Sequence, residues 1–450
     1  DLSLFKNIRQ AKFRRSKDLS DRVGQFMLAS YILFFLLFLV FPLGTLILKS
    51  VQDQKGNFIG LKNYLIYLNE PALFQSFFNS LFIAIVSTII VVILAFSFAY
   101  ALTRTCMPFK GFFRLIALIP LLSPSILAAI ALVYWFGNKG ILKALLFGNS
   151  IYGPIGIIMA SVYWTFPHAL MILSTSLSLS DSRLYEAAEV LKTSRLRAFL
   201  TITIPGARYG IISTTFVIFT QVFTDFGVPK VIGGNYNMLA TDIYKEVVGM
   251  QNFQMGAVIS LVLLLPSLIA FFIDQYSRKK QISLLTSRSV VFKPKKSFGV
   301  DSLMLSYCVL ITLIILMMIG MAQFGALVEF WPYNLSFTLK HYQFEVAGLG
   351  WESFYNSVRL AFYTAIFGTV IIFIGSYIVE KLKSDERLRG ILQLFTLMPM
   401  SVPGLVLGLS YIFYFNAKDN PINFIYATMT ILVINTIVHF YTVSHLTGVT

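Results

Sequence analysis

The segment FNSLFIAIVSTIIVVILAFSFAYAL, Phe78–Leu102, runs for 25 residues without a charged side chain. A helix rises about 1.5 Å per residue, and the hydrocarbon core of a bilayer needs roughly 20 apolar residues, so this run is long enough to cross it. The apolar residues are continuous and do not alternate with polar ones, which disfavours a strand of a membrane β-barrel. The segment therefore predicts a transmembrane α-helix.

The same character recurs along the whole chain. Of the 450 residues, 57% are hydrophobic and 12% are charged, whereas about a quarter of the residues of a soluble protein are charged. We expect an all-α integral membrane protein with about ten transmembrane helices. Cys106 and Cys308 are far apart and predict no disulfide framework. The predicted spans are 26–49, 78–102, 112–136, 154–178, 209–229, 255–274, 302–325, 356–380, 390–415 and 424–446.

The positive charges indicate how these spans are oriented. The net charge is +16, and 26 of the 36 Lys and Arg residues lie in every second connection. Because Lys and Arg accumulate in cytoplasmic loops, the N-terminus is predicted to be cytoplasmic. The basic run Lys293-Pro294-Lys295-Lys296 is interpreted as part of a solvated linker near anionic lipid headgroups, in preference to a nucleic-acid site. The predicted cytoplasmic segments are 1–25, 103–114, 179–208, 275–301 and 381–389.

Matched landmarks indicate an internal duplication. Phe77-Phe78-Asn79-Ser80 recurs as Phe354-Tyr355-Asn356-Ser357 at an offset of 277 residues, and Pro120-x-x-x-Pro124 recurs as Pro399-x-x-x-Pro403 at an offset of 279. Two homologous units in one chain are therefore predicted. We expect an N-terminal basic segment over 1–25, a first unit of about six spans over 26–274, a basic cytoplasmic linker over 275–301 and a second, incomplete unit of about four spans over 302–450.

The proline pairs are the first candidates for a translocation pathway. A proline inside an apolar helix lacks a backbone donor and kinks the helix, which is tolerated at membrane depth where protein or a water-filled cavity satisfies the freed carbonyls. Breaks at matched points of two halves point to a shared axis. The alternative is a packing kink without substrate contact. The candidates are Pro120, Ser123, Pro124, Pro399, Ser401 and Pro403.

A polar stripe in the fifth span is the second candidate. Gln221, Thr224 and Asp225 follow the spacing i, i+3, i+4 and are predicted to share one helical face. Charges at membrane depth usually face a cavity or a partner, so this face is predicted to line the external half of a pathway, with Arg359 as the opposite charge. The alternative is an interfacial residue near the outer headgroups, because Pro229 and Lys230 follow closely.

The most informative cytoplasmic stretch runs from Glu186-Ala187-Ala188-Glu189-Val190-Leu191-Lys192 to Ile202-Thr203-Ile204-Pro205. Asp181 is suited to cap a short helix, and the alanine pair predicts a smooth face that another surface can approach closely. Pro205 suits the first turn of the next helix. A short helix held between two membrane spans is suited to transmit a displacement to them. Guanidinium donors that suit carboxylates surround it, namely Arg183, Arg195 and Arg197.

This stretch resembles the EAA loop of ABC importer permeases, in which Glu-Ala-Ala is followed by three residues, Gly, nine residues and Ile-x-Leu-Pro. Every spacing matches, but Lys192 replaces the Gly and Ile204 replaces the Leu. Because Gly eases the turn between two short helices, Lys192 suggests a different turn geometry or a direct charge contact with a partner. The Asn-Ser pairs and the proline-bearing spans are also typical of these permeases, so the resemblance covers most of the chain, twice.

The resemblance implies a type I ABC importer transmembrane fold in the bacterial inner membrane. It implies two half-permeases around a pseudo-two-fold axis, with the pathway between them. Two separate ATP-binding cassette subunits would bind ATP and Mg and dock on coupling helices within 181–208. A periplasmic or lipoprotein binding protein would deliver the substrate. The coupling residues that the resemblance implies are Arg183, Glu186, Ala187, Ala188, Lys192, Arg195, Ile202, Ile204 and Pro205.

The chain itself is predicted to be a transport subunit, not an enzyme. It has no Gly-x-x-x-x-Gly-Lys-Ser/Thr phosphate loop, and its spacings suggest no catalytic residues, no metal site and no cofactor of its own. An ion-driven secondary transporter is the less favoured class, because it would need acidic residues buried in several spans. A membrane-embedded enzyme would need clustered His, Asp or Glu.

The resemblance indicates the family more specifically than it indicates the transported substrate. Fused two-half permeases resemble importers of iron(III) and of 2-aminoethylphosphonate, and the sequence between Phe223 and Phe253 looks closer to the phosphonate group. The prediction is therefore 2-aminoethylphosphonate or a similar small anion, with iron(III) as the alternative, and thiamine, sulfate and polyamine importers share the EAA loop. By internal offset, a second EAA loop is expected near residue 465, beyond Thr450, so this chain is expected to stop before the second coupling helix.

Overall fold

The computed structural model describes residues 19–179, 181–283, 292, 294–343, 350–381 and 386–449. Residues 1–18 of the N-terminal basic segment and several residues of the predicted linker lie outside this part. The described residues are mainly helical, with a short antiparallel hairpin made of β1 (Val328–Phe330) and β2 (Asn334–Phe337). The α-helices are α2 (Leu19–Phe35), α3 (Phe41–Ser50), α4 (Lys62–Asn69), α5 (Pro71–Arg104), α6 (Lys110–Leu118), α7 (Ser125–Phe136), α8 (Pro154–Ser178), α9 (Ser182–Val190), α10 (Arg195–Ala198), α11 (Ile204–Phe223), α12 (Gly227–Ile232), α13 (Leu239–Tyr244), α14 (Phe253–Ser283), α15 (Phe298–Leu327), α16 (Gly350–Lys381), α17 (Glu386–Leu397), α18 (Gly404–Phe415) and α19 (Met429–Val449).

The helix lengths confirm the prediction of an integral membrane protein. Eight helices in the described ranges are long and apolar enough to cross a membrane, or up to ten if each of two bent helix pairs counts as one span. The predicted spans fall on these elements, and the differences concern the third, fifth and ninth.

The third and ninth spans are broken in the same way. The segments Lys110–Leu122 and Ser125–Phe136 meet at 101°, and Glu386–Ser401 and Gly404–Phe415 meet at 112°. In each pair a 3₁₀ turn that contains the first proline precedes the break, and the second proline lies just before the next helix. The Oγ of Ser123 donates to the carbonyl of Pro120 at 3.0 Å, and that of Ser401 to Met398 at 2.7 Å, so hydroxyls satisfy carbonyls at the break. The predicted kinks are confirmed in both repeats.

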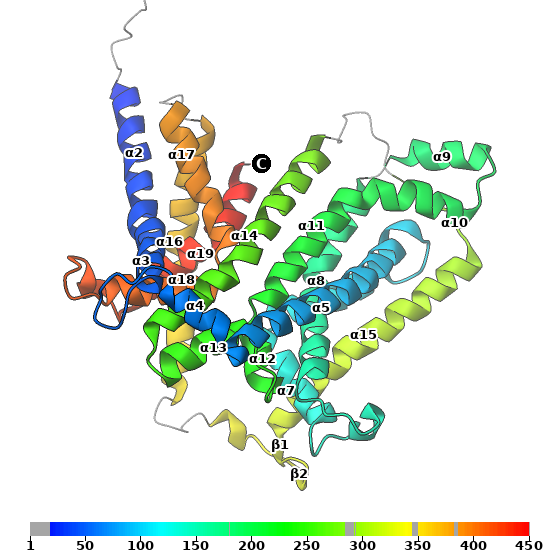
Figure 1. Ribbon diagram of the computed structural model, residues 1–450. Coiled ribbons are helices and arrows are strands. Elements are labelled where there is room, and N and C mark those ends of the chain that lie inside the picture. Colours follow the sequence, from blue (N-terminus) through cyan, green and yellow to red (C-terminus); the bar gives the residue numbers. More distant parts are fainter. Residues whose placement is uncertain are drawn as a thin grey trace, which may run out of the picture. The chain divides into compact units, whose positions relative to one another are not determined.

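The chain divides into two compact units that differ from the predicted repeats (Figure 1). The central unit comprises residues 47–352, and the split unit comprises 1–46 and 353–450. Helix α2, which leads the first repeat, packs against α17 in the split unit, whereas α15, which leads the second repeat, packs against α5, α6 and α7 in the central unit. Each leading helix thus packs with helices of the other repeat, and the repeat boundaries remain a prediction from sequence.

The core of the central unit is formed by α5, α8, α11 and α14. Helix α11 packs against the other three, and α5 packs along α8. Gly210 of α11 lies so close to α8 that a Cβ there would be 2.2 Å from the Oγ of Ser176. Small residues permit such close helix approach in membranes, where lipid provides no hydrophobic force between helices. The aromatic rings of Phe98 and Phe166 close the α5–α8 contact at 5.6 Å.

The split unit is held by tyrosines that donate to backbone carbonyls. Tyr31 of α2 donates to the carbonyl of Ile371 at 2.7 Å, and Tyr411 of α18 donates to that of Phe38 at 2.6 Å. Tyr441 of α19 is fully buried against the ring of Phe35, with centroids 4.8 Å apart. These contacts hold α2 and the π turn that follows it (Leu36–Val40) against helices more than 300 residues away in sequence.

The predicted fifth span, 209–229, is wrong at both ends. The helix begins earlier, because α10 continues through a π turn (Phe199–Thr203) into α11. It ends at Phe223, and α12 begins at Gly227. Asp225 therefore lies between two helices and not on one.

Candidate functional site

The Glu-Ala-Ala stretch lies on α9, which connects α8 to the α10–α11 helix. Asp181 caps its N-terminus, because its carboxylate accepts a hydrogen bond from the backbone N–H of Arg183 at 3.1 Å. The Arg183 guanidinium pairs with the same carboxylate at 3.0 Å. The hydroxyl of Ser182 donates to Glu186 at 3.2 Å. The predicted cap is confirmed, and the Arg183 side chain contacts its own helix end.

Helix α9 ends in a Schellman turn centred on Lys192. The N–H of Thr193 donates to the carbonyl of Ala188 at 2.8 Å, and that of Lys192 donates to Glu189 at 2.9 Å. This bond pair places the residue after the helix in the left-handed region that glycine prefers, and Lys192 has a φ of 51°. The lysine thus adopts the conformation that glycine favours, and the expected change of turn geometry is not seen.

Replacing Lys192 by glycine is expected to stabilise the protein. A non-glycine residue in the left-handed region costs about 1 kcal/mol, and the greater flexibility of glycine in the unfolded chain offsets part of this gain. We expect Lys192→Gly to raise the free energy of unfolding by about 0.5 kcal/mol, measured by thermal or denaturant unfolding of the purified protein. Lys192→Ala removes the same charge but keeps the strain, so an equal gain in that variant would contradict this account.

The outer side of the loop carries an uncovered apolar surface. Ala188 is buried, whereas Glu186 and Ala187 are exposed, so the alanine pair does not form a single face. We define the α9–α10 apolar surface by four side chains that are 55–82% exposed in the described chain, Leu184, Val190, Leu191 and Leu196. Sequence reasoning missed this surface, although Val190 and Leu191 directly follow the Glu-Ala-Ala stretch.

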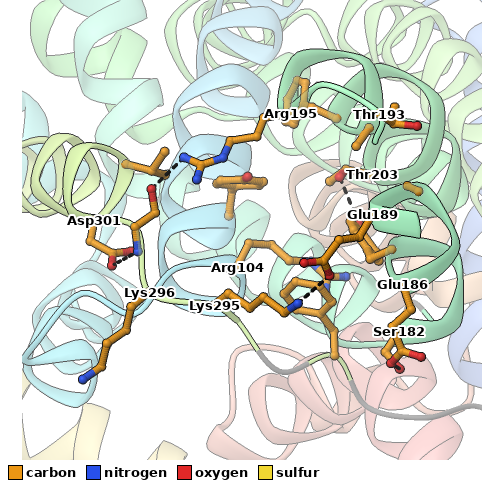
Figure 2. A pocket seen from close by; sticks show the side chains of 18 residues that line it. Arg104, Ser182, Glu186, Glu189, Thr193, Arg195, Thr203, Lys295, Lys296 and Asp301 are labelled. Atoms are coloured by element: carbon orange, nitrogen blue, oxygen red, sulfur yellow. Dashed lines mark hydrogen bonds and ion pairs between the residues drawn. The ribbon is translucent and has the colours of Figure 1, made fainter. Parts of the chain in front are cut away.

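The inner side of the loop closes a pocket of about 630 Å³ (Figure 2). The Arg104 guanidinium, from the end of α5, lies over the rings of Tyr185 and Phe292, at 4.9 and 4.3 Å from their centroids. Arg104 also donates to the carbonyl of Leu177 at 2.6 Å. Arg195 donates to the hydroxyl of Ser297 at 2.6 Å. The pocket joins α5, α9 and α10 to the segment that precedes α15.

The remaining residues of the motif lie on the helix that enters the membrane. Ile202 is on the π turn before α11, and Ile204 and Pro205 are in the first turn of α11. The Glu-Ala-Ala part and the Ile-x-Ile-Pro part thus occupy two helices joined by the turn at Lys192. The hydroxyls of Tyr185 and Thr203 connect the two helices at 3.0 Å.

Asp225 connects α12 to the break after α6. Its carboxylate accepts hydrogen bonds from the N–H groups of Gly227 and Val228 at 3.3 and 3.0 Å and from the Oγ of Ser125, the first residue of α7, at 3.1 Å. The structure therefore brings together two groups of candidates that the sequence presented separately, the break at Pro120–Pro124 and Asp225.

The predicted stripe of Gln221, Thr224 and Asp225 on one helical face is wrong, because α11 ends at Phe223. Thr224 donates its hydroxyl to the carbonyl of Thr220 at 2.9 Å. The buried Oε1 of Gln221 has no hydrogen-bond donor among the described residues. Arg359 lies on α16, in the split unit, and its pairing with Asp225 stays a prediction.

The Asn-Ser landmark of the first repeat anchors the segment before α13. Asn79 donates to the carbonyl of Asn237 at 2.9 Å, and Ser80 accepts from the N–H of Leu239 at 2.9 Å. One turn earlier, Ser76 donates to the buried carboxylate of Asp242. Burial raises the pKa of Asp242, while the Ser76 hydrogen bond and the charge of Lys245 oppose this rise. Sequence reasoning did not assign this role to the Asn-Ser pair.

Within the described residues, no group of three or more His, Cys, Asp or Glu side chains could hold a metal ion. The contacts observed at these sites are helix packing, helix caps and hydrogen bonds. The loop formed by α9 and α10 has a capped helix with an apolar outer surface, and the helix breaks have polar groups where the helices are interrupted.

Parts of the chain are similar in sequence to known transport proteins. Residues 106–283 match the family model of the binding-protein-dependent transport system inner membrane component. The chain is 27% identical over 440 residues to the ferric transport system permease protein FbpB of Actinobacillus pleuropneumoniae, covering 91% of this chain and 60% of that protein. It is 27% identical over 421 residues to the putative ferric transport system permease protein FbpB 1 of Haemophilus influenzae, covering 87% and 64%.

The chain thus spans about three fifths of the length of these relatives. A crystal structure of a bacterial ABC transporter involved in the import of the acidic polysaccharide alginate aligns over 63% of this chain and 100% of that chain, with a TM-score of 0.47 and 14% identity. The family match contains the bent pair α6–α7, the coupling loop and α11. Residues 106–283 therefore resemble the binding-protein-dependent transport system inner membrane components, and the chain is a multi-pass inner-membrane protein.

Proposed function

We propose that this chain is the translocation subunit of an ATP-driven importer. It receives a small solute from a binding protein outside the membrane and passes it to the cytoplasm by alternating access. The observation that carries this proposal is the coupling loop, in which a helix capped at both ends presents the α9–α10 apolar surface. Such a surface on a protein exterior marks a site of interaction with another protein.

Two separate ATPase subunits are the proposed partners of this surface. In this proposal the partner subunits bind ATP and Mg. ATP binding brings these subunits together, and α9 moves with the subunit on which it docks. Because α9 is connected to α8 and, through α10, to α11, and because α11 packs against α5, α8 and α14, this movement reaches the core of the central unit. The bundle then opens outward to accept solute.

The polar groups at the helix breaks are the proposed lining of the pathway in the central unit. Ser125 and Asp225 meet where α7 begins and α12 begins. A broken helix leaves backbone groups that can contact solute where a continuous helix would hide them. The matching break at Pro399–Pro403 in the split unit is the proposed counterpart in the second repeat.

Iron(III) is the proposed cargo. The relatives that cover most of this chain are named ferric transport permeases, so the comparisons favour iron(III), the alternative in our sequence interpretation, over 2-aminoethylphosphonate. The preference for phosphonate came from the resemblance of residues 223–253 alone.

Uptake measurements test both the proposed cargo and the proposed ATP-driven mechanism. Cells with the assembled transporter, meaning this permease with its ATPase subunits and binding protein, are compared with cells lacking the permease. We expect loss of radiolabelled iron(III) uptake in the deletion strain and unchanged uptake of labelled 2-aminoethylphosphonate. Loss of phosphonate uptake alone would overturn the cargo. Uptake that continues when the ATPase subunits are inactivated would overturn the importer mechanism and support an ion-driven transporter.

A further inference from the structure

Phe292 and residues 294–297, from the predicted linker between the two repeats, lie against the inner side of the α9–α10 loop. We call Phe292 and residues 294–297 the linker strap; it ends where α15 begins at Phe298. Figure 2 shows Lys295 directed at Glu189 on α9, and Arg195 directed at the segment beside Asp301. A linker that served only to connect two repeats would have no need of contacts with this loop.

An aromatic stack forms the first attachment of the strap. The rings of Phe292 and Tyr185 lie 4.6 Å apart, and the Arg104 guanidinium lies 4.3 Å from the Phe292 ring centre. Arg104 is only 7% exposed, and cation–π contacts are strongest when the cation is shielded from water. Removing Phe292 would therefore expose one face of a buried cation and one side of an α9 residue.

Polar contacts with α9 and α10 form the second attachment. Lys295 makes an ion pair with Glu189 of α9, and Arg195 of α10 donates to Ser297 at 2.6 Å. The ion pair is exposed, with side chains 77% and 61% accessible, so on its own it adds little stability. Together with the stack, these contacts attach the strap at three places on one rigid loop.

The far end of the strap is fixed to the start of α15. The Asp301 carboxylate accepts from the N–H of Ser297 at 3.0 Å and from the N–H of Cys106, just after α5, at 2.8 Å. Helix α15 runs from this point to the β1–β2 hairpin, at the opposite end of the helix from α9 and α10 (Figure 1). Along its length it packs against α5, α6 and α7.

We propose that the linker strap is a second output of the coupling loop, which passes the displacement of α9 to α15. Phe292, Lys295 and Ser297 act as positioning residues that hold α9 and α10 against the start of α15. The displacement of α9 is then transmitted in two directions. One runs through α11 into the core, and the other runs through the linker strap into α15, the helix that leads the second repeat. This inference rests on the proposed function of α9 as the docking site for an ATPase.

A charge exchange tests the strap in the assembled transporter. Glu189→Lys and Lys295→Glu are each expected to lower the solute transported per ATP hydrolysed by several fold, because each places like charges together, while ATPase subunits still co-purify. The double variant restores an opposite pair and is expected to recover most of the coupling ratio. Singles without effect, or a double variant no better than the singles, would overturn the strap. Failure of ATPase subunits to co-purify with the unsubstituted chain would instead overturn the proposed function.

A second measurement uses the purified permease without partners. Phe292→Ala is expected to increase hydrogen–deuterium exchange in residues 182–198 by several fold, because α9 loses an attachment. Phe298→Ala is the matched control, since it removes the same ring six residues further along from a side chain that is 91% exposed, and it should leave the exchange unchanged. No increase in Phe292→Ala, or equal increases in both variants, would overturn the strap.

Discussion

Val190→Glu is expected to release the ATPase subunits and to lower solute uptake by at least about tenfold. Val190 is 82% exposed at the end of α9 and belongs to the α9–α10 apolar surface. Burying an unpaired carboxylate in an apolar interface costs several kcal/mol, and each 1.4 kcal/mol changes an equilibrium about tenfold. The measurement is co-purification of the ATPase subunits with the permease, together with uptake in cells.

The design separates docking from folding. Because Val190 is exposed, Val190→Glu should change thermal stability little, and Val190→Leu keeps an apolar side chain at the same place and should retain both ATPase subunits and uptake. Full ATPase binding by Val190→Glu would show that the α9–α10 apolar surface is not the docking site. A loss in Val190→Leu as large as in Val190→Glu would show that shape, not polarity, decides the contact.

Asp225→Ala is expected to have the second largest effect, a loss of uptake of about tenfold or more with a lower melting temperature. The substitution removes the acceptor for Ser125 and for the N–H groups of Gly227 and Val228. Leaving a buried donor unsatisfied costs about 1–3 kcal/mol, and three donors lose their partner at the point where α7 and α12 begin. The loss of these hydrogen bonds is expected to lower both the stability of the protein and its transport activity. Uptake and thermal unfolding are therefore measured together.

Two neighbouring variants sharpen this test. Asp225→Asn keeps one carbonyl oxygen as acceptor and should fall between the unsubstituted protein and Asp225→Ala. Thr224→Ala removes a hydroxyl that only bonds back to Thr220 within α11, so it should be nearly neutral. Full uptake and unchanged stability in both Asp225 variants would remove Asp225 from the mechanism.

The coupling loop was largely predictable because its determinants are local. A capping aspartate and the spacing from Glu186 to Pro205 specify two short helices and the turn between them. The conformation of Lys192 could not be inferred from lysine itself, since it follows from the Schellman hydrogen bonds that close the end of α9. The sequence pattern predicted where the turn lies, and the backbone hydrogen bonds at the end of α9 determined its conformation.

The fifth span shows where a local pattern misleads. The spacing of Gln221, Thr224 and Asp225 suggests one face only if the helix continues to Pro229. The helix instead stops at Phe223. The carboxylate of Asp225 accepts hydrogen bonds from Gly227 and Val228 at the start of α12 and from Ser125, a residue 100 positions away. A hydrogen bond of that sequence separation cannot be read from periodicity.

The sequence by itself determined the membrane-spanning helices, the paired breaks and the capped coupling helix. Each depends on properties of neighbouring residues: the length of an apolar run, the missing N–H of proline, or the side-chain oxygen of a cap. Only the tertiary structure decided that α2 and α15 pack with helices of the other repeat and that Arg104 lies against the rings of Tyr185 and Phe292. The physical reason is that apolar helices present many similar faces, so the choice among partners depends on close packing between distant residues.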